Sequence, residues 1–252
     1  MEAAPLTEDS IQDDTKGDVI VLSSAFFATR GVEVKISGVS KSYRTLAEEV
    51  HALQNIDWEV DAGQATAIMG PSGCGKTTLL NLLGGVDRAS RGKVVVDGQD
   101  LGQATERQLE RYRLLKVGFI FQLFNLIPSM TATENLELPM LVAGVKERER
   151  KERTRALLDM VGLAEKGQKR PEELSGGEQQ RVAIALALAN DPAVILADEP
   201  TGNLDTTNAA VIAKLLRSLS IEFKKTVIMV SHDPKVVEYF PTVYSMLDGR
   251  FV

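Results

Sequence analysis

The fold of this chain is decided by one glycine-rich stretch, which reads Gly70-Pro71-Ser72-Gly73-Cys74-Gly75-Lys76-Thr77 and is followed by Thr78. Glycines allow successive backbone N–H groups to turn toward phosphate oxygens, the lysine reaches the β- and γ-phosphates, and the threonine hydroxyl ligates magnesium. The apolar run at residues 65–69 predicts a buried strand before this loop, and residues 77–83 predict a helix after it. Strand, glycine loop and helix in this order predict a nucleotide phosphate site.

Further strands and helices alternate along the chain. Residues 32–36 and 56–60 alternate between apolar and polar side chains, which is typical of strands with one face exposed. Residues 117–121, 193–197 and 226–230 are uninterrupted apolar runs, as expected for parallel strands covered on both faces. The pattern predicts an α/β core.

Polar side chains follow the ends of these predicted parallel strands. Asp198 and Glu199 follow one strand, His232 follows the next, and Gln122 follows a third. Open α/β sheets bind ligands at the carboxyl ends of their strands, and a carboxylate there can organise magnesium while another orients or deprotonates the attacking water. A lone histidine is more often structural, but its place beside the expected γ-phosphate favours a functional role.

Composition limits the remaining possibilities. The chain has 252 residues, a formal net charge of -6 and a pI near 5.2, so a nucleic-acid partner is not expected. Cys74 is its one cysteine, which excludes an intramolecular disulfide and a cysteine-based zinc site. We expect residues 1–30 to form an acidic, disordered or loosely docked tail, and residues 31–252 to form the folded domain.

A second string, Leu174-Ser175-Gly176-Gly177-Glu178-Gln179, lies about a hundred residues after the glycine loop. Taken with the loop, it makes residues 32–252 resemble the nucleotide-binding subunit of an ATP-binding cassette transporter. The resemblance implies a P-loop, RecA-like core with an antiparallel β subdomain and a helical subdomain at about residues 123–188. It also implies ATP and Mg²⁺ as ligands.

The resemblance assigns roles to particular residues. Tyr43 is expected to stack on adenine, and the loop from Gly70 to Thr78 is expected to hold the phosphates. Asp198, with Thr77 and Gln122, is expected to hold magnesium, Glu199 to act as catalytic base, and His232 to contact the γ-phosphate.

Other residues are expected to act on a second subunit. Ser175, Gly176, Gly177 and Glu178 are expected to contact ATP held by the other copy in a head-to-tail homodimer, and Leu204 and Asp205 to lie at the dimer contact. Ser175 and its glycines begin a helix, which provides N–H groups for an anion. A monomer then contains two half-sites and no complete one.

Residues 118–128, 131–139 and 197–205 are similar to a narrower group, which includes the macrolide and lipoprotein-release exporter ATPases. This similarity implies a peripheral position on the cytoplasmic face of the plasma (inner) membrane, beneath a membrane subunit with four transmembrane helices and a large extracytoplasmic domain. The partner surface is expected within residues 123–145, with Phe124, Leu126, Ile127, Met130 and Leu138 as its apolar side chains.

Two alternatives to a transporter subunit share these motifs, a non-transport cassette protein and a regulatory ATPase. A translation factor of this family would carry two cassettes, and a DNA-organising ATPase would carry long coiled coils, whereas this chain has one phosphate loop and no sustained heptads. A cell-division type regulatory ATPase, which acts through its membrane partner on an external hydrolase, would have the same ATP site. The sequence does not distinguish a regulatory ATPase of this type from the ATPase of an exporter.

Overall fold

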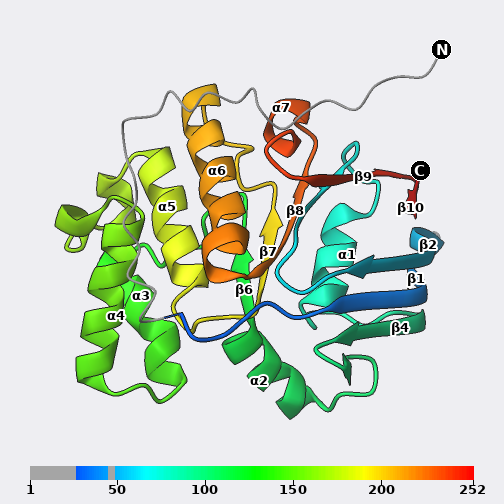
Figure 1. The fold of residues 1–252 in the computed structure, drawn as a ribbon, viewed down its shortest axis with the longest axis horizontal. Coiled ribbons are helices and arrows are strands. Elements are labelled where there is room, and N and C mark those ends of the chain that lie inside the picture. The colour runs from blue at the N-terminus through cyan, green and yellow to red at the C-terminus, as the bar shows by residue number, and fades with distance from the viewer. Residues whose placement is uncertain (1–26, 45–48) are drawn as a thin grey trace.

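The computed structural model describes residues 27–44 and 49–252, which form two sheets with helices packed around them (Figure 1). The first sheet is antiparallel, with strand order β2-β1-β4-β5. It contains β1 (Val34–Arg44), β2 (Glu49–Val60), β4 (Arg91–Val96) and β5 (Gln99–Asp100).

The second sheet has the strand order β10-β9-β3-β8-β7-β6 and is parallel from β9 to β6. Its strands are β3 (Ala65–Met69), β6 (Val117–Ile120), β7 (Val194–Asp198), β8 (Thr226–Ser231), β9 (Thr242–Leu247) and β10 (Arg250–Phe251). The three uninterrupted apolar runs of the sequence therefore lie side by side as β6, β7 and β8. The α/β class predicted from the sequence is confirmed.

The two faces of the parallel sheet belong to two different cores. Ile195 and Ala197 point to the face covered by the helices α3 (Ala132–Val142), α4 (Glu147–Met160), α5 (Gly176–Ala187) and α6 (Thr206–Phe223). Val194 and Leu196 point to the other face, where α1 (Lys76–Leu83), α2 (Glu106–Lys116) and the antiparallel sheet pack. Because residues of a strand alternate between faces, one apolar run serves both cores.

The helices on the left of Figure 1 are joined by short segments. Two 3₁₀ turns, η2 (Ala164–Lys166) and η3 (Pro171–Glu173), connect α4 to α5, and α7 (Pro234–Val237) follows β8. Thr131 begins α3 with a capping box, in which its hydroxyl accepts a hydrogen bond from the Glu134 N–H.

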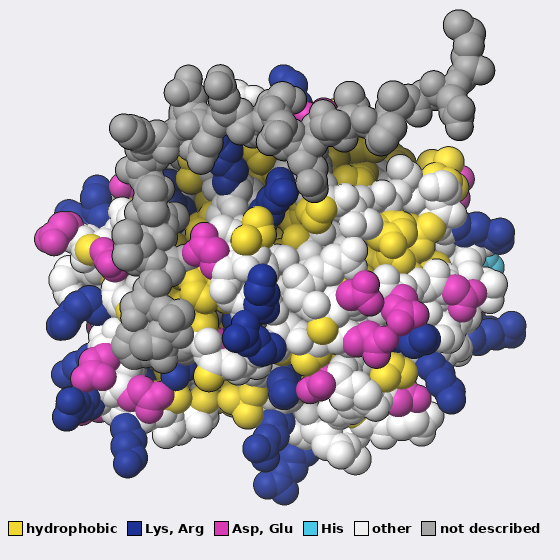
Figure 2. Space-filling view, in the orientation of Figure 1, with side chains coloured by type: hydrophobic (Ala, Val, Ile, Leu, Met, Phe, Trp, Pro, Cys, Tyr) yellow, Lys and Arg dark blue, Asp and Glu magenta, His cyan; other side chains and the backbone are white. Residues whose placement is uncertain are grey.

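On the visible face in Figure 2, charged side chains of both signs are intermixed.

The strand boundaries differ from the sequence expectation at β1 and β2. The alternation at 32–36 predicts a short strand, but β1 continues to Arg44, and its pairing with β2 shifts register at several points after Ile36. Each shift changes which face the next side chain occupies, so the alternation is lost although the strand continues. This extension carries Tyr43 to the edge of the phosphate loop.

The described chain begins with a segment bound to the core. The carboxylate of Asp191 accepts hydrogen bonds from the backbone N–H groups of Ala28 (3.0 Å) and Thr29 (2.8 Å). Lys225, which is fully buried, donates to the Thr29 carbonyl at 2.7 Å and pairs with Asp191. Burial lowers the pKa of Lys225, and Asp191 opposes this effect. Residues 1–26, with most of the expected acidic tail, lie outside the described residues.

Candidate functional site

The predicted site residues collect where three parallel strands end. In the pairing of β3 with β8 and β8 with β7, Met69 aligns with Ser231, and Asp198 aligns with Val230. The glycine loop leaves β3, residues 199–205 leave β7, and residues 232–233 leave β8, all at this one edge (Figure 1). The sheet therefore brings together segments that are more than a hundred residues apart.

The glycine loop has a backbone that only glycine adopts readily. Gly73 and Gly75 have φ of 81° and 108°, in the left-handed region. A Cβ on Gly70 would lie 2.3 Å from the Met246 carbonyl oxygen, and one on Gly75 would lie 2.4 Å from the Ala52 carbonyl oxygen. The loop is thus fixed by strand β9 on one side and by β2 on another.

Lys76 lies inside this loop. Its side chain is only 6% exposed, and its Nζ donates to the carbonyl oxygens of Gly70 (2.7 Å) and Pro71 (3.0 Å). The Lys76 Nζ also lies 3.5 Å from Oε1 of Glu199. The ammonium group therefore stands between the loop and the carboxylate that follows β7.

Glu199 is held by two strands. Its backbone N–H donates to the Val230 carbonyl at 3.1 Å, and its Oε2 lies 2.9 Å from Nδ1 of His232. Its φ of 47° is uncommon for a residue other than glycine, and strained backbone of this kind is frequent at functional sites. Glu199 thus contacts both Lys76 and His232, as an acid–base residue beside a phosphate site would.

Asp198 faces the start of helix α1. The Thr77 hydroxyl donates to Asp198 Oδ1 at 3.1 Å. Burial raises the pKa of the Asp198 carboxyl, and the Thr77 hydroxyl and Lys76 oppose the rise. A bound cation would stabilise this carboxylate, and the hydroxyl and carboxylate oxygens suit Mg²⁺. The described residues contain no cluster of three or more His, Cys, Asp and Glu that could hold a metal by itself. The donor set therefore fits an ion shared with phosphate oxygens.

Gln122 lies at the same edge but makes different contacts from those expected. Its side-chain Nε2 lies 2.8 Å from where a Cβ on Gly202 would be, and its backbone carbonyl accepts from the Asn203 side chain at 2.9 Å. Within residues 27–44 and 49–252, no hydrogen bond joins it to Thr77 or Asp198. Its role in metal binding stays a prediction.

Tyr43 lies beside the first turn of α1, with 38% of its side chain exposed. Its phenol donates to Asp87 Oδ2 at 2.8 Å. Burial raises the pKa of this phenol, as does Asp87, whereas the Thr78 hydroxyl lowers it. Asp87 has no motif in the sequence that marks it, because it meets Tyr43 only in the folded chain.

The second predicted half-site begins helix α5. The Ser175 hydroxyl accepts from the Glu178 N–H at 3.3 Å, while the Ser175 N–H donates to the Glu178 carboxylate at 2.8 Å. These two bonds form a capping box. A Cβ on Gly176 would lie 3.7 Å from the Leu204 side chain, and one on Gly177 would lie 2.5 Å from the Asn208 side chain. Gly176 therefore packs against the turn that precedes α6, and Gly177 packs against the first turn of α6.

Asp205 caps α6 by accepting from the backbone N–H of Asn208 at 2.9 Å, and this hydrogen bond lowers the pKa of the Asp205 carboxyl. The structure thus groups Ser175 through Glu178 with Leu204 and Asp205. In the described part of the chain, no hydrogen bond or ion pair connects this group to the loop from Gly70 to Thr78.

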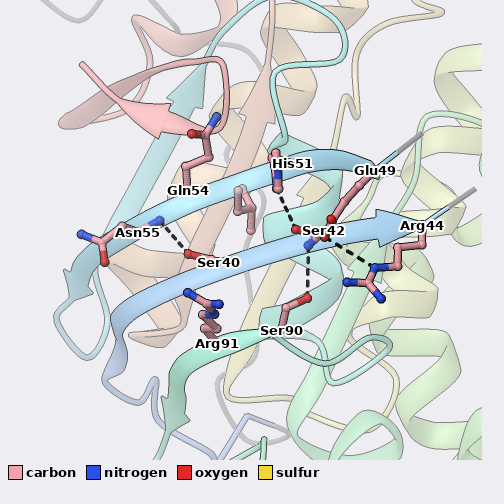
Figure 3. Close-up of a pocket in the computed structure, with 10 residues that line it drawn as sticks. Ser40, Ser42, Arg44, Glu49, His51, Gln54, Asn55, Ser90 and Arg91 are labelled. Carbon is pink, nitrogen blue, oxygen red and sulfur yellow. Dashed lines mark hydrogen bonds and ion pairs between the residues drawn. The ribbon is translucent and has the colours of Figure 1, made fainter.

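A hollow of about 820 Å³ lies elsewhere, on the antiparallel sheet (Figure 3). Most of its lining residues have polar side chains, with Leu53 as the exception, and the Ser42 hydroxyl pairs with His51 Nδ1 at 2.9 Å. Arg44 and Glu49 lie at its rim, with a closest separation of 3.8 Å. None of the residues assigned to phosphate or metal lines this hollow.

A glycine loop with a buried lysine, facing two carboxylates at the ends of parallel strands, defines the class of P-loop nucleoside triphosphatases. Such a site can hold a triphosphate and place a carboxylate beside the attacking water. Comparison with known proteins narrows the class. Residues 53–202 match the model of the family described as ABC transporter.

Individual relatives agree with this match. An uncharacterized ABC transporter ATP-binding protein of Thermotoga maritima is 47% identical over 217 residues, which cover 86% of this chain and 92% of the relative. A lipoprotein-releasing system ATP-binding protein, LolD, of Chromohalobacter salexigens is 42% identical over 224 residues, which cover 89% and 94%. A solved structure of the ATP-binding cassette MJ0796, from Methanocaldococcus jannaschii, has a TM-score of 0.80 and 40% identity, and the match covers 86% of this chain and 96% of that chain.

The chain belongs to the ABC transporter family and is an ATPase of the cassette type. The resemblance read from the two sequence motifs is therefore confirmed, as is the P-loop fold. Among the described residues, no helix is both long and apolar enough to cross a membrane.

Proposed function

We propose that this chain binds Mg·ATP and hydrolyses it to drive a membrane subunit. The observation that carries the proposal is the continuous contact from Lys76 through Glu199 to His232, beside the Thr77–Asp198 pair. The loop N–H groups and Lys76 bind the phosphates, and magnesium supplies further charge neutralisation when bound. Glu199 accepts a proton from water as the water oxygen attacks the γ-phosphorus, the bond to the β-phosphate oxygen breaks, and ADP leaves.

The active form that we propose is a head-to-tail homodimer. Ser175 caps helix α5, whose first glycines pack against Leu204 and Asn208, and no hydrogen bond or ion pair among the described residues joins them to the glycine loop. A related cassette, MJ0796, has been solved as a dimer in a post-hydrolysis state bound to ADP and Pi, which supports the same arrangement here. In this arrangement each ATP lies between the loop of one subunit and Ser175 of the other, so hydrolysis loosens the pair.

The proposed membrane contact lies in the segment after Gln122 and in α3. Leu123, Leu141 and Val142 are 75%, 56% and 67% exposed, which is unusual for large apolar side chains so close in sequence. Phe124, Leu126, Met130 and Leu138 are half-buried beside them. This surface is available to a membrane subunit, and it would hold the ATPase at the cytoplasmic face of the membrane.

The cargo that we propose is lipophilic, a peptide or a lipoprotein, and the direction is export or extraction. Support comes from the similarity to LolD proteins, which are named for lipoprotein release and are 40% to 42% identical to this chain in several bacteria. The partner expected from that similarity has four transmembrane helices and a large extracytoplasmic domain.

The test uses Glu199→Gln, which keeps the size of the side chain but removes the base. We expect turnover to fall by about 10²- to 10⁴-fold while ATP binding is retained, so that tagged protein with Mg·ATP captures its membrane subunit. The measurements are ATPase rate, dimer fraction and mass spectrometry of the membrane proteins that co-purify.

Glu222→Gln, an exposed acid-to-amide change on α6, is the matched control and should behave as the native chain. Native turnover in Glu199→Gln would contradict the assigned base. Recovery of a many-helix permease would contradict the proposed type of partner. Recovery of a four-helix partner that acts on an external hydrolase would favour the cell-division type of function over export.

A further inference from the structure

The Tyr43 side chain is held from several directions by residues that no motif includes. Its phenol donates to Asp87 Oδ2 at 2.8 Å, and Asp87 lies in the turn that follows α1. Lys41, two residues before Tyr43 on β1, places its Nζ 4.7 Å from the centroid of the Tyr43 ring. The same ammonium donates to Asp87 Oδ1 at 2.6 Å.

These contacts form a closed group of three side chains. Lys41 is itself fixed by a 2.9 Å bond to the Arg88 carbonyl, and Asp87 accepts a further bond from the Arg88 N–H at 2.6 Å. The Asp87 carboxylate therefore has partners at both oxygens. These partners lower the pKa of Asp87, although burial opposes them. A carboxylate bound in this way is a rigid support, because moving it breaks several charge-assisted hydrogen bonds.

The group leaves part of the tyrosine ring available. The Lys41 ammonium lies over the ring within the range of a cation–π contact, yet 38% of the Tyr43 side chain is exposed. An aromatic ring that is fixed at its hydroxyl and covered on one side can stack a base on the other side without losing further freedom of its own. Asp87, which supports the tyrosine, lies in the turn after α1, and the phosphate loop leads into the start of the same helix at Lys76. Helix α1 therefore connects the support of Tyr43 to the phosphate loop.

We propose that Asp87 and Lys41 are positioning residues for nucleotide binding, which fix Tyr43 as a stacking platform for the base of ATP. This inference rests on the proposed function and on the stacking of Tyr43 on adenine that the family resemblance implies. Asp87 orients the ring through the phenol, and Lys41 ties Asp87 to β1 and covers one side of the ring. Neither residue contacts the phosphates, so their contribution depends on the presence of a base.

The test compares two ligands, Mg·ATP and inorganic tripolyphosphate with Mg²⁺, the second of which carries phosphates without a base. In Asp87→Ala, we expect the Kd for ATP to rise about 5- to 10-fold, as for loss of a hydrogen bond to a charged group, while the Kd for tripolyphosphate stays within about 2-fold of native. Equal weakening of both ligands would overturn the proposal, because it would mean that Asp87 supports the phosphate loop.

A double-mutant cycle isolates the contact between the phenol and the carboxylate. Tyr43→Phe keeps the ring but removes the hydroxyl, and we expect about 3-fold weaker ATP binding. The variant with both changes should bind ATP no more weakly than Asp87→Ala alone. Additive losses would contradict the positioning role. Asp87→Asn keeps an acceptor for the phenol, so it should restore ATP affinity to within about 2-fold of native.

The matched control is Glu59→Ala, which breaks another lysine–carboxylate pair of the antiparallel sheet, that of Lys35 on β1 and Glu59 on β2 at 3.0 Å. It should leave the affinities for both ligands unchanged. Tyr43→Ala distinguishes a failure of the stacking by Tyr43 from a failure of the positioning by Asp87. If Tyr43→Ala does not weaken ATP binding, the expected stacking of Tyr43 on adenine is wrong. If it weakens ATP binding but Asp87→Ala does not, only the positioning by Asp87 fails.

Discussion

Helices α1 and α5 both present their amino ends at predicted phosphate contacts, but the two ends are built differently. Helix α1 begins after Gly75, which has a left-handed backbone, no side-chain cap and no acidic residue in the first turn. Helix α5 begins after Ser175, whose hydroxyl and N–H are both bonded to Glu178, an acidic residue of the first turn. One amino end leaves its N–H groups open to a ligand, and the other is already capped by its own chain.

The difference indicates how binding is divided between the two ends. At α1, we propose that an uncapped helix end, a buried lysine and a glycine loop act together on one anion, so that this end binds phosphate within a single chain. At α5, the Glu178 carboxylate compensates the positive end of the helix dipole. That end would then be a weak anion site alone, and in the proposed dimer it adds to binding once another subunit has brought its ATP. The comparison predicts large effects at the first end and small ones at the second.

The largest effect is expected for Lys76→Ala. This change removes the cation that lies between the loop carbonyls and Glu199, and we expect ATP affinity to fall more than about 100-fold, since a buried ion pair or charge-assisted contact is worth about 3–5 kcal/mol. Isothermal titration with Mg·ATP measures the change, and circular dichroism checks the fold. Affinity within a few-fold of native would remove the basis for treating α1 as the primary phosphate site.

Asp198→Asn tests the metal side of the same end. Burial raises the pKa of this carboxyl, so ionised Asp198 lowers the free energy of unfolding near neutral pH, and the cost disappears as the pH falls through the raised pKa. The amide avoids that cost. We therefore expect the free protein to become more stable at pH 7, with a smaller gain at pH 4, while Mg²⁺-dependent turnover falls by about two orders of magnitude.

Thermal unfolding at both pH values and an ATPase titration with Mg²⁺ measure the Asp198 effects. If the variant were less stable than the native chain at pH 7, the raised pKa would not reflect a cost of burying the charge. If turnover stayed native, the Thr77–Asp198 pair would not belong to the metal site.

Ser175→Ala should have a moderate effect on ATP-dependent dimerisation and none on ATP binding by the monomer. It removes one hydrogen bond of the capping box, which costs about 1 kcal/mol in helix stability, and it removes a hydroxyl from the proposed contact with the other subunit's ATP. We expect ATP-dependent dimerisation to weaken about 10-fold, measured in a Glu199→Gln background by analytical ultracentrifugation. ATP binding to the monomer should not change. A loss of monomer binding comparable to that of Lys76→Ala would show that the two helix ends are not divided as proposed.

Much of the first helix end could be predicted from sequence because its residues are contiguous. The strand at 65–69, the loop and the helix up to residue 83 all appear where the local pattern places them. The buried strands at 117–121, 193–197 and 226–230 were also predicted within one residue at each end. Periodicity is reliable here because both faces of these strands are buried, so each run is continuous.

What the sequence did not predict depends on tertiary contact. Tyr43 and Asp87 are 44 residues apart, and β1 loses its alternation before it reaches Tyr43, so nothing local joins the two. Helix α6 was not predicted, because it belongs to none of the motifs. Two signals could have indicated it: Asp205 as an N-cap, and the helical spacing of Ile212, Leu216 and Leu219. The contact of Gln122 with Gly202 likewise arises from the packing of β6 beside β7.

The smallest and most discriminating effect is expected for Glu178→Gln. Glutamine can keep the capping box through its side-chain oxygen, so the helix start should remain folded while its negative charge is lost. The native carboxylate is bonded to the Ser175 N–H and lies 3.3 Å from Lys166 Nζ, and the Ser175 bond lowers the pKa of Glu178. Glu178 is therefore charged at neutral pH, directly where an incoming γ-phosphate would approach.

Removing that charge should strengthen ATP-dependent dimerisation about 2- to 5-fold. One charge at a helix end contributes about 0.3–1 kcal/mol, which corresponds to a change of this size. Glu173→Gln, an exposed acid-to-amide change in η3 just before Ser175, is the matched control, and its effect should be smaller. The gain should shrink at high salt, because exposed charges are screened. Weaker dimerisation in Glu178→Gln would mean that the carboxylate holds the second subunit directly. In that case the amino end of α5 would bind the other subunit through a protein contact. The two helix ends would then differ in what they bind, protein at α5 and phosphate at α1, and not in how strongly they bind an anion.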